Sequence, residues 1–284
     1  MREENKVTVA LDAMGGDYAP LETVKGAVQA ACVDEDLVIK LFGDRAKIEE
    51  ELAKYNYDAG RIIIEEAATV IENTEHPVEA IKKKRDSSMV KALFSVRNGE
   101  ADACVSCGNT GALLVGGQVV VGKLKGVERC GLAFIVPSKQ GPVMIIDCGA
   151  SVDSRPAMLV QFAQMASVYM KEVMGIENPR VGIVNIGEEE EKGNQLVQET
   201  IPLLKECASI NYIGSVESRG ITEGMADVVV CDAFVGNIIL KMYEGVASFI
   251  LKAMKETLTS DFKTKLGALM IKKRLKESMK TFSI

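Results

Sequence analysis

Lys192 and Asn194 lie close together in the sequence, shortly after a strand-like run, and their side chains suit a reaction in which negative charge develops. A lysine supplies a point charge for a phosphate group, and an asparagine amide can donate a hydrogen bond to an oxyanion. We predict both as catalytic residues, together with Asn237, which follows another strand-like run. The four glutamates at 188–191 are equally typical of a solvated loop or an acidic first helical turn.

Two glycine-bearing turns follow strand-like runs in the first half of the chain. In the turn 12–17, paired glycines let backbone N–H groups approach a ligand, and in the turn 106–112 a helix N-terminus suits phosphate. Each pattern also fits an ordinary turn, or an asparagine or threonine that caps its own helix. The predicted substrate- or phosphate-binding residues are Asp12, Gly15, Gly16, Asp17, Gly108, Asn109, Thr110 and Gly111, with Asp147 and Asp232 after two later strand-like runs.

The chain lacks the residues of several common catalytic and binding sites. Its single histidine, His76, precedes Pro77 at an apparent helix start, and no G-x-S-x-G motif exists to partner it. We expect His76 at the surface or at a helix cap, and a reagent that is already nucleophilic, such as phosphate dianion. Neither a Walker A loop nor G-x-G-x-x-G is present. Cys104 and Cys107 form a lone C-x-x-C, so we predict no metal site and no cofactor.

The elements that must position these residues alternate along the chain. Short β-rich runs are followed by helical segments, and prolines at 20, 77 and 156 are placed to begin helices. Alternation of this kind predicts an α/β fold with three layers, in which helices cover both faces of a mostly parallel sheet. The expected strands are residues 6–12, 37–42, 61–65, 102–106, 143–147, 181–185 and 227–231.

Composition sets the broad class of the protein. The 284 residues are 47% hydrophobic, enough for a full core, and we expect a single α/β domain with a possible subdomain break near residue 156. The formal net charge of −6 does not favour nucleic acid. The polar first residues do not resemble a signal peptide, and we find no uninterrupted apolar run of about 18 residues. Seven scattered cysteines favour reduced thiols and a cytoplasmic protein.

The carboxyl-terminal part becomes helical and basic, and we predict a protruding helical pair over about 246–282. A basic amphipathic segment can lie on an anionic membrane surface. It can also dock an acidic partner protein, or pack against a second copy of the chain with a solvated basic face. The residues predicted for membrane or partner contact are Phe249, Ile250, Met254, Leu258, Lys272, Lys273 and Arg274.

Taken together and in order, several of these segments resemble the PlsX-type phosphate acyltransferases. Any one segment alone would be a weak signal, but the series runs from residue 9 to about 245 and is highly specific. The matching segments are residues 9–17 with Ala19 and Pro20, then 87–89, 108–112, 147–150, 161–163, 179–182, 185–194 and 227–237.

The resemblance implies a fold akin to isopropylmalate dehydrogenases and phosphate acetyltransferases, in a homodimer. It implies the reaction of acyl-[acyl carrier protein] with inorganic phosphate to give acyl phosphate and free carrier protein. Acyl phosphate would feed a membrane glycerol-3-phosphate acyltransferase in phospholipid synthesis, so a cytoplasmic enzyme peripherally associated with the membrane is expected. Glycine usually stands in the family at the position of Ala233, and asparagine at those of Ser151 and Ser215.

Three other functions remain open from the sequence. A coenzyme A-dependent phosphate acetyltransferase would share the fold and use a smaller acyl group. A metal- and NAD-dependent hydroxyacid dehydrogenase would need carboxylate ligands, for which Asp147, Asp153, Asp227 and Asp232 are the candidates. A peripheral membrane scaffold would rely on the basic helices alone.

Overall fold

The computed structural model describes residues 6–280, without the side chains at 275, 276 and 278–280. The chain divides into two compact units, Met1–Val127 and Glu128–Ile284. The change in character expected near residue 156 lies inside the second unit, where helix α6 (Pro156–Glu172) begins with Pro156 at its first turn.

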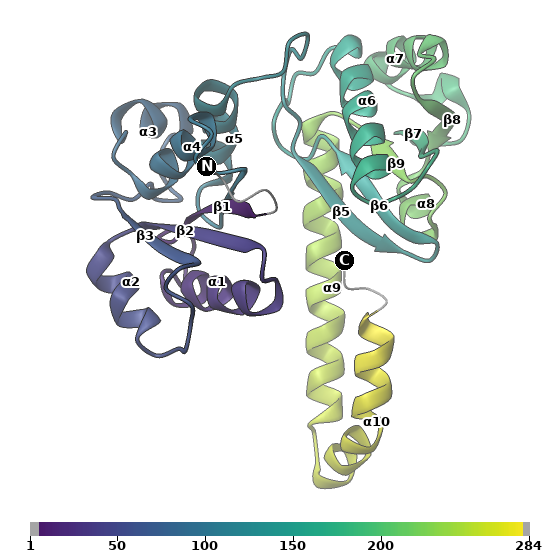
Figure 1. Ribbon diagram of the computed structural model, residues 1–284. Coiled ribbons are helices and arrows are strands. Elements are labelled where there is room, and N and C mark those ends of the chain that lie inside the picture. Colours follow the sequence, from purple (N-terminus) through teal and green to yellow (C-terminus); the bar gives the residue numbers. More distant parts are fainter. Residues whose placement is uncertain (1–5, 281–284) are drawn as a thin grey trace. The chain divides into compact units, whose positions relative to one another are not determined.

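The first unit is built on a parallel sheet with the strand order β3-β2-β1-β4. Figure 1 labels its strands β1, β2 and β3. Its strands are β1 (Val7–Asp12), β2 (Leu37–Gly43), β3 (Ile62–Glu66) and β4 (Ala103–Ser106). Apolar residues of α1 and α2 pack on one face, and α4 packs on the other beside α3 and α5. These helices are α1 (Leu21–Val33), α2 (Arg45–Leu52), α3 (Pro77–Lys83), α4 (Ser88–Arg97) and α5 (Thr110–Gly116), the last continued by η1 (Gly117–Val121).

The strand order of the first unit creates a point where ligands commonly bind. From β1 the chain proceeds to β2 and β3 on one side, whereas β4 pairs with the other side of β1. The helices that follow β1 and β4 therefore lie on opposite faces of the sheet, the arrangement found at the binding crevice of doubly wound folds. The two predicted glycine-bearing turns follow these two strands.

The second unit has a sheet with the strand order β5-β6-β9-β7-β8. Edge strand β5 is antiparallel to β6, and the remaining pairs are parallel. The strands are β5 (Ala133–Ser138), β6 (Gly141–Ile146), β7 (Arg180–Val184), β8 (Asn211–Val216) and β9 (Val228–Val230). Helices α6 and α7 (Gln195–Glu206) cover one face, and α8 (Ser218–Glu223) with the first turns of α9 (Ala233–Leu258) covers the other.

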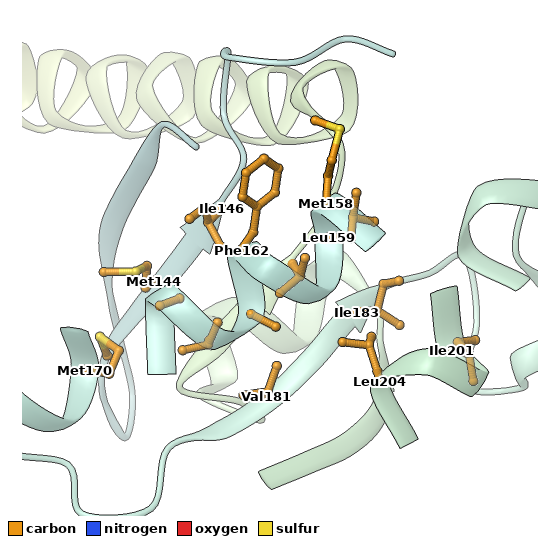
Figure 2. Close-up of a cluster of buried hydrophobic side chains, with 14 residues drawn as sticks. Met144, Ile146, Met158, Leu159, Phe162, Met170, Val181, Ile183, Ile201 and Leu204 are labelled. Atoms are coloured by element: carbon orange, nitrogen blue, oxygen red, sulfur yellow. The ribbon is translucent and has the colours of Figure 1, made fainter. Parts of the chain in front are cut away.

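The core of the second unit explains why these strands are nearly continuous apolar runs. On one face Phe162 and Met170 of α6, both with 0% exposure, meet Ile146, Val181 and other strand residues (Figure 2). Because helices cover both faces, successive strand residues are buried whichever way they point. The expected α/β architecture, with helices on both faces of mostly parallel sheets, is confirmed.

A helical hairpin forms the carboxyl-terminal end of the second unit. Helix α9 extends beyond the sheet, and α10 (Phe262–Lys280) runs back beside it (Figure 1). The pair was expected from about residue 246, but α9 already begins at Ala233 because Asp232 caps it directly after β9. Residues 281 and 282, also in the expected range, lie outside the described residues.

Each predicted strand is present, with bounds shifted by no more than two residues, but β5 and β8 were missed. Strand β8 contains Gly214 with φ +106°, and its register with β7 shifts at this point, so its apolar pattern is interrupted. Strand β5 contains Pro137, which is tolerated because it lies on an edge strand.

Candidate functional site

A cavity of about 910 Å³ lies in the second unit at the carboxyl ends of β7, β8 and β9. The loops after β7 and β9 lead to helices on opposite faces of the sheet, so they diverge and leave a crevice. The floor is apolar, and polar side chains gather on the loops. The apolar lining residues are Leu159, Val184, Ile186, Leu196, Val197, Val235, Ile238 and Ile239, and the polar ones are Asn185, Lys192, Asn194, Glu217, Ser218, Arg219 and Asp232.

Lys192 closes the short helix η2 (Glu190–Lys192) and provides a cation at this cavity. Its Nζ lies 2.9 Å from the Glu189 carboxylate, in an ion pair whose side chains are both about half-exposed. The hydrogen bond and charge of Glu189 raise the pKa of Lys192 above its ordinary value, and the carboxylates of Glu191 and Glu217 add to the effect. Lys192 is therefore suited to bind an anion and not to accept a proton at neutral pH.

Asn194 lines the same cavity, and the oxygen and nitrogen of its side-chain amide have different roles. Its side-chain oxygen accepts a 2.9 Å hydrogen bond from the Val197 N–H and so caps α7. Among the described residues no protein acceptor is seen for its Nδ2, which can donate to a ligand. The predicted residues Lys192 and Asn194 are thus brought to one cavity.

Asn185 was not predicted as a site residue, yet it holds the loop that carries Lys192. The side chain is 6% exposed, and its Nδ2 donates to the Glu189 carbonyl and to Ser215 Oγ, each at 3.1 Å. Its Oδ1 accepts from the Ile186 N–H at 2.8 Å. In the sequence, the signal that could have identified Asn185 is its position directly after the apolar run 181–184. Glu217, Ser218 and Arg219 were missed because β8, the strand before them, was not predicted.

Asp232 and Asn237 both lie near the start of α9, but only Asp232 lines the cavity. The Asp232 carboxylate caps α9 by accepting from the N–H groups of Phe234 and Val235 at 2.9 and 3.0 Å. The Asn237 Nδ2 donates to the Cys148 carbonyl at 3.1 Å, so this amide supports the loop after β6. Burial raises the pKa of the neighbouring Cys231 well above its ordinary value, so its thiol stays neutral.

Asp147 is fully buried and serves the loop after β6. Its two carboxylate oxygens accept hydrogen bonds from four backbone N–H groups at 2.8–3.0 Å, those of Leu132, Gly149, Ala150 and Ser151. An ideal Cβ on Gly236 would lie 1.9 Å from the Asp147 carbonyl oxygen, so only glycine lets α9 approach this loop. Asp147 was predicted to bind substrate, and in the structure its carboxylate hydrogen-bonds to backbone N–H groups of the protein.

In the first unit, the turns after β1 and β4 pack against each other. The Asp12 Oδ2 accepts a 2.7 Å hydrogen bond from Ser106 Oγ, which in turn accepts from the Gly108 N–H at 3.0 Å. A Cβ on Gly15 would lie 2.6 Å from Asp12 Oδ2 and 2.8 Å from the Gly108 nitrogen. Gly16 has φ +106°, a conformation that favours glycine. The residues predicted in these two turns therefore lie side by side, while Asp17 beside them is exposed.

Asn109 has a structural task at the same edge of the first unit. It caps α5 through the Ala112 N–H, and its Nδ2 donates to the carbonyls of Glu72, Asn73 and Glu75 at 3.1–3.3 Å. Thr110 is the first residue of α5 and is exposed, and Gly111 is closely packed on Pro77. His76 stands at the N-cap position of α3, as expected.

The carboxylates proposed as metal ligands for a dehydrogenase are not gathered. Asp227 lies at the amino end of β9, where it pairs with Arg180 at 2.9 Å, whereas Asp147 and Asp232 lie at the carboxyl edge of the sheet. Across the described residues, no group of three histidine, cysteine, aspartate or glutamate side chains is arranged to hold a metal ion.

The helical hairpin presents an apolar surface. Phe249 is 73% exposed, and Ile250, Met254 and Leu258 line an apolar groove of about 390 Å³ with Ile271 of α10. The predicted cations Lys272, Lys273 and Arg274 are exposed. Among the described residues, α9 is the one helix that is long and apolar enough to span a membrane. Single helices of soluble proteins can have the same length and composition.

Comparison with known proteins identifies related sequences and folds. The family model described as fatty acid synthesis protein matches residues 7–283. A phosphate acyltransferase of Clostridium perfringens strain SM101 is 52% identical over 259 residues, covering 91% of this chain and 76% of the relative. One from Bacillus licheniformis is 47% identical over 274 residues, covering 96% and 81%.

Solved structures with little sequence similarity share the fold. The EutD phosphotransacetylase of Staphylococcus aureus superposes with a TM-score of 0.61 at 18% identity, covering 86% of this chain and 83% of the other. A phosphotransacetylase of Streptococcus pyogenes gives 0.60 at 13% identity with the same coverage.

Proposed function

Because the chain belongs to the fatty acid synthesis protein family, we propose that it is a phosphate acyltransferase that transfers a long-chain acyl group from acyl carrier protein to inorganic phosphate. The observation that carries this proposal is the cavity of the second unit, where the Lys192 cation and the Asn194 amide stand over an apolar floor. A cation and a neutral donor suit an anionic nucleophile and a carbonyl, and the apolar floor suits a hydrocarbon-bearing substrate.

The proposed reaction needs no covalent enzyme intermediate. A phosphate oxygen attacks the thioester carbonyl carbon, the carbon–oxygen bond forms and the carbon–sulfur bond breaks. The carrier-protein thiolate leaves and takes up the proton that hydrogen phosphate brought. Holding the two reactants in place can lower the barrier by roughly 7–11 kcal/mol in well-oriented systems. This suits a cavity whose thiol, that of Cys231, stays protonated.

Lys192 would neutralise phosphate as it approaches the thioester. The Asn194 Nδ2, for which the described residues offer no acceptor, would donate to the carbonyl oxygen as it gains charge, a contribution of about 3–4 kcal/mol for a well-placed donor. Asp232 would cap the start of α9, and the Asn237 amide, which does not line the cavity, would hold the loop after β6. The first unit's turns at Asp12–Asp17 and Gly108–Gly111 would hold phosphate or the carrier protein's prosthetic group.

We extend the proposal to assembly and location. The enzyme would work as a homodimer in the cytoplasm and at the membrane surface, where acyl phosphate passes to a membrane glycerol-3-phosphate acyltransferase. Exposed apolar residues such as Phe249, beside the cations Lys272, Lys273 and Arg274, support such a contact surface.

Trapping of acyl phosphate with hydroxylamine tests the proposed reaction. Purified protein would be incubated with phosphate and either long-chain acyl-[acyl carrier protein] or acetyl-coenzyme A. We expect acyl hydroxamate that depends on enzyme and phosphate, with the carrier-protein thioester as the much better donor. Preference for acetyl-coenzyme A, or no phosphate-dependent product from either donor, would contradict the proposal.

A further inference from the structure

The cation proposed to bind phosphate already holds an anion of the protein itself. Lys192 Nζ contacts Glu189 Oε1 at 2.9 Å, and the same ion pair lowers the pKa of Glu189, chiefly through the Lys192 hydrogen bond. Glu191 and Glu217 are also close enough to act on the charge of Lys192. A phosphate dianion that approaches Lys192 therefore meets a cation that is neutralised and surrounded by carboxylates.

The loop geometry fixes this ion pair over the backbone of Gly187. A Cβ at Gly187 would lie 2.8 Å from Glu189 Oε2 and 2.9 Å from Lys192 Cδ, so both side chains fold over the space that glycine leaves. The Nδ2 of the buried Asn185 donates to the main-chain carbonyl of Glu189 and to Ser215 Oγ of β8, and so fixes the loop to the sheet. Most exposed ion pairs are loosely held, but here the backbone brings the partners together.

We propose that Glu189 occupies the phosphate position on Lys192 in the resting site and is displaced when phosphate binds. This rests on the proposed function, in which Lys192 receives phosphate. Glu189 is then a specificity-determining residue for the anion. A monovalent anion gains little by replacing one carboxylate charge with another, whereas a phosphate dianion brings two charges to Lys192. The acidic segment thus sets the affinity for phosphate and discriminates against monovalent anions.

Neighbouring glutamates supply a matched set of variants. Glu189→Gln removes the competing charge from Lys192, and Glu189→Asp keeps the charge on a shorter side chain. Glu190→Gln removes the same charge from the next residue, whose carboxylate instead pairs with Lys205 at 2.7 Å. Lys192→Ala removes the proposed phosphate ligand.

Calorimetric titration with inorganic phosphate, without an acyl donor, measures the effect directly. We expect Glu189→Gln to lower the Kd for phosphate about two- to fivefold, the range typical of an exposed ion pair. The Kd for phosphate of Glu190→Gln should equal that of wild type. The Kd of Glu189→Asp should lie closer to the wild-type value than that of Glu189→Gln. General damage to the loop would weaken binding, so tighter binding is the diagnostic result.

Equal or weaker phosphate binding by Glu189→Gln would overturn the inference. Lys192→Ala separates this failure from that of the proposed function. If Lys192→Ala leaves the Kd unchanged, Lys192 is not the phosphate ligand and the assignment of the site fails. If Lys192→Ala weakens phosphate binding while Glu189→Gln does not tighten it, Lys192 is confirmed as a phosphate ligand. The inference that phosphate displaces Glu189 is then wrong.

Discussion

Single side chains at the carboxyl ends of the strands differ in whether they have bonding capacity to spare. Asp147 has none, because four backbone N–H groups use its carboxylate. Asn194 keeps its Nδ2 available while its oxygen caps α7. Asp147 and Asn194 were both predicted as site residues because the sequence shows that each follows a strand. It does not show whether the side chain turns back to the backbone or faces a cavity.

Replacing Asn194 with serine separates its two tasks. Serine is a comparably good N-cap, so the free energy of unfolding should change by less than about 0.5 kcal/mol. Serine lacks the amide donor, so kcat for acyl phosphate formation should fall about 10²- to 10³-fold. Urea denaturation and steady-state kinetics measure the two effects, and Asn194→Ala should lose both functions. Wild-type kcat in Asn194→Ser would remove the amide from the mechanism.

Among the elements, the strands were easier to predict than the loops that follow them. Buried strands such as Val228–Val230 are recognised because apolar residues continue without alternation. Strand β8 was not predicted because Gly214 interrupts its apolar pattern. The polar residues of the loop that follows, Glu217–Arg219, were therefore not predicted either. The order of strands in space, which places β9 between β6 and β7, is set by tertiary packing and has no local signal.

One ion pair joins two of these strands at the edge opposite the cavity. Arg180 at the start of β7 donates to the Asp227 carboxylate through its backbone N–H and its guanidinium, at 2.7–3.0 Å. Burial alone would raise the pKa of Asp227, but the hydrogen bonds and charge of Arg180 outweigh it and hold this pKa below its ordinary value.

The pH dependence of stability should report this pair. A lowered carboxyl pKa stabilises the fold above the unfolded value of about 3.9, and the contribution is lost as pH falls through the folded pKa. Asp227→Asn should therefore cost about 2 kcal/mol of unfolding free energy at pH 7, with a smaller difference from wild type near pH 3. Urea titrations at both pH values check this. Glu223→Gln, which breaks the exposed pair with Lys139, should change stability by less than about 0.5 kcal/mol at either pH. A pH-independent loss in Asp227→Asn would contradict the role of its charge.

For the whole molecule, the sequence predicted the α/β class, the helical hairpin and the family, because these depend on patterns spread over many residues. It did not predict two compact units with separate sheets, although the boundary at Val127 lies in a segment rich in glycine and basic residues, 122–131, which is typical of a linker. Likewise, the predicted anion-binding residues fall into two sets: the turns of Asp12 and Gly108 in the first unit, and the cavity of Lys192 in the second.

The central claim is that phosphate is acylated at the cavity of the second unit, and the phosphate dependence of Lys192→Ala tests it most directly. Lys139→Ala is the matched control, because it also removes an ion-paired lysine of the second unit but lies in the turn between β5 and β6. We predict that Lys192→Ala lowers kcat/KM for phosphate about a hundredfold in the hydroxylamine assay, whereas Lys139→Ala matches wild type. Equal kcat/KM values for Lys192→Ala and Lys139→Ala would contradict the claim.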